Sequence, residues 1–259
     1  MSSLFITLLL GVATLLSWPL AKGMLWAMHP GENVGGFRQR IESLFQRVGG
    51  RAVSHDQNWK EYALSMLFFN AVMFLVVYAI LAFQQNLPLN PDGKGGLEPS
   101  LIFNTVASFV TNTNLQHYSG EVSLSYFSQL FGLMWLQFVS AATGIAALAA
   151  LARGLAGKTR IGNFYRDLMR ATFLVLLPLA VVVAVLLVLG GVPMTLQGAA
   201  TVQTLEGTVQ TIARGPVAAL VAIKQLGTNG GGYFGSNSTH PFENPSFFIN
   251  LVECICIIQ

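Results

Sequence analysis

The sequence predicts an all-helical integral membrane protein in which long spans alternate with short helices and polar loops that enter the bilayer. Three observations predict this class. Of the 259 residues, 53% are hydrophobic and only 10% are charged, whereas about 25% of the residues in globular domains are charged. Charge-free runs long enough to cross a bilayer recur along the chain. Two of the connections between them hold a short apolar stretch that is followed directly by Thr and Asn.

The same composition excludes several classes of protein. A soluble enzyme or a disordered chain of this length would carry a far more polar sequence. The net charge of +3 is too small to indicate nucleic acid or another polyanion as a partner. The two cysteines, Cys254 and Cys256, lie in an apolar stretch, where we expect small core residues rather than a disulfide framework.

Four charge-free runs are the candidate spans, because a bilayer-crossing helix needs about 20 mostly apolar residues. They are 1–21, 62–83, 122–152 and 171–189. Lys22 follows the first run instead of preceding it, which favours a retained helix over a signal peptide. A fifth segment, 246–259, is too short to span and contains Glu253, so we expect its other half to lie beyond Gln259.

The distribution of Lys and Arg predicts the orientation. The segment 22–60 holds six of the 14 and 153–170 holds five, whereas 84–121 and 190–245 together hold three. Because cytoplasmic loops are enriched in Lys and Arg, we expect the first two segments in the cytoplasm and the N-terminus outside. Alternating spans that start from an outside N-terminus give the same assignment.

The connection 84–121 is too apolar for an ordinary loop. Residues from about 101 to 110 form an apolar stretch of three helical turns, about 15 Å long, which is about half of a hydrocarbon core. We predict a pore helix there. The residues that follow it form the first predicted filter segment: Thr111, Asn112, Thr113 and Asn114.

The connection 190–245 repeats this plan. A second pore helix is predicted over about 215–227, because Pro216 suits the first position of a helix. The second predicted filter segment follows it: Thr228, Asn229, Gly230, Gly231 and Gly232. The Thr-Asn pairs at 111 and 228 lie 117 residues apart.

These repeats divide the chain into three parts. Residues 1–61 form a membrane helix and a cytoplasmic loop. Residues 62–170 form the first pore repeat and a second cytoplasmic loop. Residues 171–259 form the second pore repeat, which ends within its last helix.

The repeated plan predicts a cation site. A short helix that ends halfway through the membrane directs its C-terminal carbonyls, with about half a negative charge, at the membrane centre. Irregular backbone at that depth is buried in protein or lines a watery cavity, where carbonyl oxygens can replace the hydration shell of an ion. The glycines at 230–232 permit backbone angles that turn successive carbonyls the same way. Interrupted segments at matching positions of internal repeats indicate the binding site of a transporter.

The sequence argues against two other kinds of site. The Gly-rich stretch lacks the Gly-Lys-Ser/Thr ending and the preceding strand of a phosphate loop. A flexible turn there would not need a Thr-Asn counterpart in the other repeat. His240 and Glu243 have the spacing of a metal pair, but Pro241 lies between them, so we expect them to brace the loop.

Three polar residues follow the first filter segment. Gln116 is close enough to it to line the mouth of the site, or to form a hydrogen bond within a turn. His117 and Glu121 are expected at the outer mouth. There an acidic group would raise the local cation concentration, or the two residues would form a solvated rim.

Three segments resemble the family of potassium-transporting A subunits of the Kdp pump. The string LGTNGGGYFGSNSTHPFENP at 226–245 resembles the second filter region of the family, and TNTNLQHYSGE at 111–121 resembles the first. QNWKEYALSMLFFN at 57–70 resembles the entry into the first repeat. The resemblance implies that 111–114 and 228–232 form filter walls, and that Gln116 and Asn237 lie close to the ion path.

The resemblance also implies a fold and a function. The fold is that of the potassium-transporter superfamily, in which four repeats of membrane helix, pore helix, filter loop and membrane helix surround one filter. About two of the four are present here. The function is selection of potassium, the transported ion, by a subunit of an ATP-driven high-affinity importer in the bacterial plasma (inner) membrane. The implied chain performs no bond chemistry and needs no organic cofactor.

The implied partners are the catalytic subunit of a P-type ATPase, a third accessory subunit, a small membrane peptide and the lipid bilayer. Family members are longer than this chain, which leaves a truncation, a split gene or an incomplete sequence as explanations. Two alternative functions stay open. The first is a passive channel or ion-coupled potassium transporter of the same superfamily. The second is a truncated scaffold fragment that does not transport ions.

Overall fold

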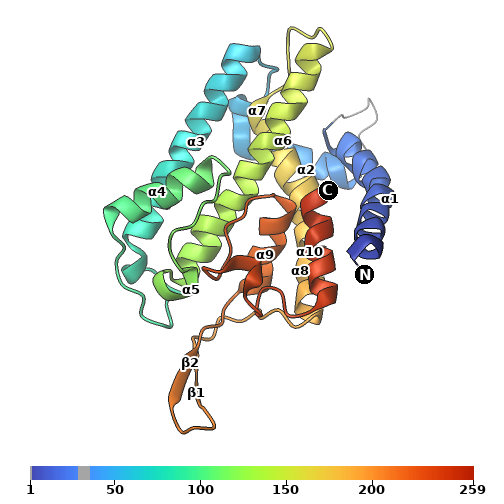
Figure 1. Ribbon diagram of the computed structural model, residues 1–259. Helices are drawn as coiled ribbons and strands as arrows, with labels where there is room; N and C mark the ends of the chain where they lie inside the picture. Colours follow the sequence, from blue (N-terminus) through green and yellow to red (C-terminus); the bar gives the residue numbers. More distant parts are fainter. Residues whose placement is uncertain (1, 29–35) are drawn as a thin grey trace. The chain divides into compact units, whose positions relative to one another are not determined.

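The computed structural model describes residues 2–28 and 36–259 (Figure 1). The chain forms two compact units. Unit 1 contains 1–72, 138–178 and residue 259, and unit 2 contains 73–137 and 179–258. The boundaries between the units fall inside three of the long helices, so each repeat predicted from the sequence contributes to both units.

Four helical stretches are long and apolar enough to cross a membrane, which confirms the predicted class of mostly helical membrane protein. They are Ser3–Met28, Trp59–Ala82, Ser128–Leu155 and Phe164–Leu189. The fourth begins seven residues before the predicted start at 171. Its first turns contain Arg166, Asp167 and Arg170, whose charges are paired within the protein and therefore do not end the helix.

Two of these stretches contain a π-helical turn. The third consists of η3 (Ser128–Met134) and α6 (Trp135–Leu155), and the fourth of α7 (Phe164–Arg170), η4 (Ala171–Leu176) and α8 (Leu177–Leu189). In the fourth stretch, Pro178 has no N–H to donate and its ring crowds the carbonyl four residues earlier. A wider turn directly before Pro178 accommodates this crowding without ending the helix.

Unit 1 contains α1 (Ser2–Met28), α2 (Phe37–Gly49), η1 (Gly50–Val53) and the first part of α3 (Trp59–Ala82). Asn58 caps α3, since its Oδ1 accepts from the N–H of Lys60 at 2.9 Å and of Glu61 at 3.0 Å. Glu61 in turn accepts from the N–H of Asn58 at 2.9 Å, which completes a capping box. The sequence Asn-Trp-Lys-Glu therefore fixes where this membrane helix begins.

Unit 2 contains the two short helices and the segments that follow them. The first is α4 (Pro99–Val110), and α5 (Gly120–Ser123) follows it. The second is α9 (Val217–Leu226), which lies beside α10 (Phe247–Ile258) (Figure 1). Short 3-10 turns, η2 (Gln84–Asn86) and η5 (Asn237–Thr239), complete the unit. The prediction placed these short helices at about 101–110 and 215–227.

A β-hairpin departs from the all-helical prediction. Strand β1 (Ala200–Gln203) pairs antiparallel with β2 (Val209–Ile212), with Ala200 opposite Ile212 and Gln203 opposite Val209. The hairpin projects from the helices of its unit (Figure 1). Its sequence is rich in Thr and Val, which favour strands, and Gly207 supplies a φ of +84° in the turn. Each strand has only four residues, which is too short for alternation of polar and apolar residues to predict a strand from the sequence.

Candidate ion-binding site

The first filter segment continues α4 through a Schellman motif, which is a common way for a helix to end. Asn112, at a φ of +59°, donates its N–H to the carbonyl of Phe109 at 3.3 Å. Thr113 donates to the carbonyl of Ser108 at 2.9 Å. The Oγ of Ser108 also accepts from the N–H of Leu115 at 2.7 Å. Ser108 therefore anchors the whole segment to the end of its helix.

The second filter segment has the same hydrogen-bonding pattern. Thr228, at a φ of +51°, donates its N–H to the carbonyl of Gln225 at 3.1 Å, and Asn229 donates to the carbonyl of Lys224 at 3.0 Å. Each segment contains a second residue with a positive φ two positions later. This residue is Asn114 in the first segment and Gly230 in the second. The two segments therefore share one backbone path after their helices.

The backbone also corrects the register between the repeats. Asn112 corresponds to Thr228 and Asn114 to Gly230 in φ and hydrogen bonding, so equivalent positions lie 116 residues apart. Matching the letters Thr-Asn gave 117. The letters mislead because equivalent backbone positions hold different residue types: Asn112 and Thr228 at the first left-handed position, and Asn114 and Gly230 at the second.

The two filter segments contact each other through amide side chains. Asn229 donates its Nδ2 to Oδ1 of Asn112, and Asn112 donates its Nδ2 to the carbonyl of Gly227 at 3.4 Å. Gln137, at the start of α6, donates its Nε2 to the carbonyl of Gly231 at 2.6 Å. The structure thus brings together two segments that are remote in sequence. It also joins the second of them to Gln137, a polar residue within the third membrane-spanning stretch.

Gln116 holds the far end of the second filter segment. Its Nε2 donates to the carbonyl of Gly232 at 2.9 Å, and its Oε1 accepts from the N–H of Gly232 at the same distance. The same Oε1 accepts from Nδ2 of Asn237 at 3.1 Å. Gln116 therefore forms bonds between the two repeats, rather than within its own turn, and Asn237 joins it.

The three filter glycines have different surroundings. A Cβ on Gly231 would lie 2.4 Å from Cζ of Phe109, and one on Gly232 would lie 2.5 Å from Oδ1 of Asn237. These two positions leave no space for a side chain. Gly230 has a φ of +96° and no atom within 4 Å of a Cβ built on it, so it borders open space. The exposed members of the two segments are Thr111, Thr113, Thr228 and Gly230.

A buried ion pair connects the helix before the second filter segment with the chain after it. The Nζ of Lys224, near the end of α9, lies 2.5 Å from Oε2 of Glu243 and 2.7 Å from Oγ of Ser238. Both charged side chains are almost completely buried. The other carboxylate oxygen of Glu243 accepts from the N–H of Phe234 at 2.8 Å. The pair therefore joins the pore helix to the chain that leaves the filter.

A second buried polar contact lies beside this pair. Gln225 donates its Nε2 to Oε2 of Glu253 at 2.5 Å and to Oγ of Ser238 at 3.0 Å. Glu253 is buried in α10. This contact explains a charged residue in an otherwise apolar segment, because its carboxylate is bonded to the end of the pore helix.

Glu121, which was predicted at the mouth, and His240, which was predicted to brace its loop, both form contacts within the protein. Glu121 accepts from the N–H of Gly235 at 2.9 Å, which ties the first repeat to the second. His240 stacks on the ring of Phe234 at 3.6 Å, and its Nδ1 accepts from the N–H of Phe242 at 3.1 Å. Among the described residues, no group of three or more His, Cys, Asp and Glu side chains could hold a metal ion.

An open cavity of about 550 Å³ lies beside the mouth residues. Gln116, His117, Tyr118 and Gly235 are among the residues that line it. Burial raises the pKa of the Tyr118 phenol above its ordinary value, so this side chain is neutral at physiological pH.

Several oxygens at the site have no hydrogen-bond donor within the described residues. The Oδ1 atoms of Asn114, Asn229 and Asn237 are buried and unpaired. The carbonyl oxygens of Thr228, Asn229 and Gly230 accept no hydrogen bond from the described chain. A buried acceptor without a partner costs about 1–3 kcal/mol. A bound cation would remove that cost, so this donor set fits an ion with oxygen ligands.

Four supporting residues were missed by the sequence analysis, namely Ser108, Gln137, Lys224 and Gln225. Two of them carried a signal. Gln137 is a polar residue inside the charge-free run 122–152, and Lys224 is a charge inside a predicted pore helix. Polar and ionisable residues at such positions are expensive in a membrane and mark functional sites. Ser108 and Gln225 carried no comparable signal, because both residue types are ordinary at helix ends.

Comparisons with known proteins identify the relatives of this chain. The family described as "Potassium-transporting ATPase A subunit" matches residues 7–259. A relative from Pseudomonas entomophila is 54% identical over 220 residues, which cover 84% of this chain and 39% of the relative. One from Parabacteroides distasonis is 44% identical over 260 residues, covering 97% of this chain and 46% of the relative.

A third relative, from Caldanaerobacter subterraneus subsp. tengcongensis, is 49% identical over 219 residues, which cover 84% of this chain and 39% of the relative. All three relatives are named potassium-transporting ATPase potassium-binding subunits. The chain therefore spans less than half the length of the curated relatives that it matches.

Proposed function

The chain belongs to the family of potassium-transporting ATPase A subunits, and from that premise we propose that its two filter segments bind and select potassium. In this proposal the chain is the non-catalytic, ion-selecting part of an ATP-driven importer. Potassium is its transported substrate. It enters at 111–114 and 228–232 and passes towards the catalytic subunit of a P-type ATPase. A third accessory subunit and a small membrane peptide complete the proposed assembly.

The observation that carries this proposal is the meeting of two equivalent turns at the ends of two short helices. Both turns follow a helix C-terminus, where the helix dipole places about half a negative charge. Three carbonyl oxygens of the second turn also accept no hydrogen bond from any residue that the structure describes. Potassium is the ion for which rings of backbone carbonyls replace the hydration shell in selectivity filters.

The proposed orientation places the N-terminus outside and the basic segments 22–60 and 153–170 in the cytoplasm. The membrane is the bacterial plasma (inner) membrane. In this orientation α4 and α9 enter from the outside and end at the filter, so potassium is selected before it crosses the bilayer. The division into 1–61, 62–170 and 171–259 then corresponds to a leading helix and two pore repeats.

Substitution of Gly230 tests the proposal. Gly230 borders open space, so an aspartate there would introduce a charge beside the unpaired carbonyls without clashing with a neighbour. We expect Gly230→Asp, expressed in its complete transport assembly, to raise the potassium concentration that gives half-maximal uptake by at least about tenfold. That change corresponds to about 1.4 kcal/mol. Uptake is measured at micromolar and at millimolar potassium.

Gly207→Asp is the matched control. Gly207 also has a positive φ and open space around its Cβ, but it lies in the turn of the β-hairpin. Both substitutions place an aspartate at a positive φ and should strain the backbone to a similar degree. Only Gly230→Asp changes a filter segment. Unchanged uptake by Gly230→Asp at micromolar potassium, or an equal loss in both variants, would contradict the filter assignment.

A further inference from the structure

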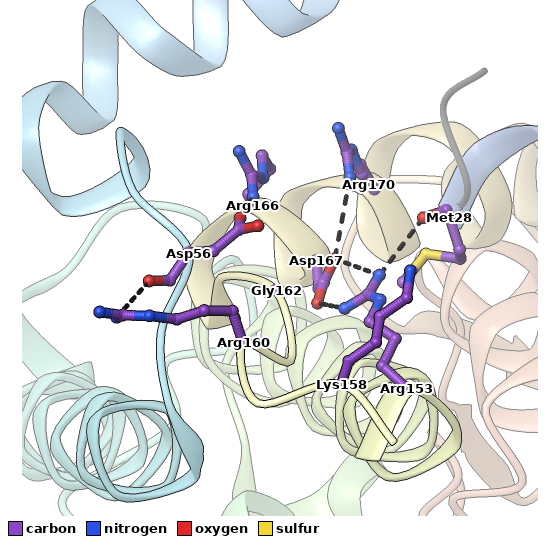
Figure 2. Close-up of a pocket in the computed structure, with 9 residues that line it drawn as sticks. All are labelled: Met28, Asp56, Arg153, Lys158, Arg160, Gly162, Arg166, Asp167 and Arg170. Carbon is purple, nitrogen blue, oxygen red and sulfur yellow. Dashed lines mark hydrogen bonds and ion pairs between the residues drawn. The ribbon is translucent and has the colours of Figure 1, made fainter. Parts of the chain in front are cut away.

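Unit 1 contains a polar cavity of about 340 Å³ that the proposed ion path does not use (Figure 2). Five basic side chains and two acidic ones line it, together with Met28 and Gly162. The basic residues are Arg153, Lys158, Arg160, Arg166 and Arg170, and the acidic ones are Asp56 and Asp167.

The cavity lies where membrane-spanning stretches end. Met28 is the last residue of α1, Arg153 lies in the last turn of α6, and Arg166 lies in the first turns of the fourth stretch. On α1, the large side chains of Leu25 and Trp26 are exposed just before that end. Tryptophan at such a position is typical of the boundary between acyl chains and headgroups.

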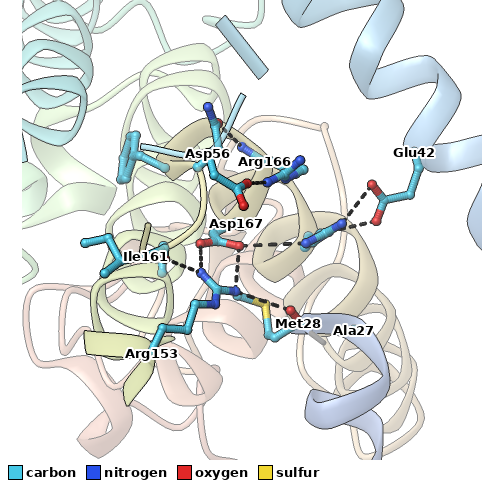
Figure 3. A network of polar contacts seen from close by, with 12 residues as sticks. Ala27, Met28, Glu42, Asp56, Arg153, Ile161, Arg166 and Asp167 are labelled. Carbon is cyan, nitrogen blue, oxygen red and sulfur yellow. Dashed lines mark hydrogen bonds and ion pairs between the residues drawn. The ribbon is translucent and has the colours of Figure 1, made fainter. Parts of the chain in front are cut away.

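Two of the five basic residues are saturated by the protein (Figure 3). Arg153 binds both carboxylate oxygens of Asp167, at 2.5 and 3.1 Å, and also donates to the carbonyls of Met28 and Ile161. Arg170 binds both carboxylate oxygens of Glu42, at 2.7 and 3.0 Å. These bidentate pairs build the wall of the cavity and leave little capacity for a ligand.

The other three basic residues keep unused donors. Arg166 pairs with Asp56 through Nη2, but its buried Nε has no partner among the described residues. Arg160 uses only Nη1, which reaches Glu61 at 3.3 Å and the carbonyl of Asp56 at 2.9 Å. Lys158 is exposed, and within the described chain its Nζ has no hydrogen-bond or ion-pair partner.

Among the described residues, the charges around the cavity are more positive than negative. The lining holds five basic and two acidic groups. Outside the lining, Glu42 pairs with both Arg170 and Arg38, and Glu61 pairs with Arg160. These carboxylates are therefore engaged by other basic residues, and Lys158 has no acidic partner in the described chain. A phosphodiester carries one negative charge and acceptor oxygens that suit guanidinium and ammonium donors.

We propose that this cavity binds the phosphate group of an anionic glycerophospholipid, through Lys158 with Arg160 and Arg166. The acyl chains would lie along the exposed apolar residues at the end of α1. Basic pockets at the ends of membrane helices bind lipid headgroups in this way. The inference rests on the proposed membrane orientation, and is independent of the filter.

Native mass spectrometry of the purified protein in detergent tests the site, with phosphatidylglycerol, phosphatidylcholine and inorganic phosphate added separately. We expect phosphatidylglycerol to remain bound. We expect Lys158→Gln to weaken this binding about fivefold, because a basic residue near a membrane surface contributes about a fivefold preference. Asp56→Asn should strengthen it, since this change frees Arg166. The readout does not depend on potassium transport, so failure of the filter proposal would leave it intact.

Lys60→Gln is the matched control. Lys60 is exposed in the same unit, lies over the ring of Trp59 and does not line the cavity. An equal loss of lipid in Lys158→Gln and Lys60→Gln, or equal retention of phosphatidylcholine, would overturn the proposal. Inorganic phosphate that binds without lipid and is lost in Lys158→Gln would support the phosphate site, but identify free phosphate as the source.

Discussion

Thr228 occupies a backbone conformation that its side chain opposes. Its φ of +51° places a β-branched residue in the left-handed region, which costs about 1–3 kcal/mol. The equivalent position in the first repeat holds Asn112, a residue that tolerates this region. Thr228 is exposed and lies in the second filter segment, so the strain is located at the proposed ion-binding site.

We expect Thr228→Asn to raise the free energy of unfolding by roughly 1 kcal/mol, because the strain is relieved. The same substitution should weaken potassium affinity, because it removes the hydroxyl oxygen. Thermal unfolding in detergent and uptake at low potassium measure the two effects. Thr111→Asn is the comparison, since Thr111 has an ordinary φ of −87° and offers no strain to relieve. A destabilised Thr228→Asn protein would show that the Thr228 side chain contributes more than its strain costs.

The pair of Lys224 and Glu243 makes a second prediction at this scale. Removing one partner leaves the other charge buried, which costs about 3–5 kcal/mol. We therefore expect Lys224→Met and Glu243→Gln each to lower the free energy of unfolding strongly. The double variant should be more stable than either single one. Thermal unfolding of the three proteins measures this coupling.

Arg160→Met is the control for that cycle. It breaks an ion pair with Glu61 in which both side chains are about half exposed, so we expect a loss of less than about 1 kcal/mol. Additive losses from Lys224→Met and Glu243→Gln would mean that the two charges are stabilised separately, and that the pair does not join the pore helix to the exit segment.

At the scale of elements, the short helices were predictable and their supports were not. Pro99 and Pro216 mark the helix starts, and the Thr-Asn and Gly-Thr-Asn sequences mark the ends. Those signals are local. Several of the contacts that hold the filter segments join residues far apart in sequence. Lys224 and Glu243 are 19 positions apart, and Gln116 and Asn237 are 121 positions apart. No spacing rule connects such partners, because helix and strand periodicities act over only a few residues.

The β-hairpin gives a prediction for an element outside the site. The hydrogen bonds described above for the filter segments involve no residue of β1 or β2, and most side chains of the two strands are exposed. Replacing 201–211 with a two-residue Asn-Gly turn keeps Ala200 and Ile212 in register. We expect unchanged potassium affinity in uptake measurements. A loss of affinity would mean that the hairpin positions the segment between Arg214 and α9.

At the scale of the molecule, the low charge has two origins. The four long helices are apolar because they are suited to the bilayer. Helices α4 and α9 and the two filter segments are uncharged apart from Lys224, whose charge is paired in the interior. Composition alone indicated the membrane class. Composition could not show that basic residues gather at a cavity in unit 1, or that Lys224 and Glu243 form a buried pair in unit 2. Both features depend on which side chains come into contact in the fold.

The contact between Asn112 and Asn229 also orders events during synthesis. The two residues are 117 positions apart, so the first turn has no partner until the second has been made. At about 5–20 residues per second, a ribosome needs roughly 6–23 seconds to cover that distance. During this interval the amide of Asn112 and both hydrogen-bonding groups of Gln116 lack their partners from the second repeat. The first repeat is therefore synthesised before its contacts with the second repeat can form.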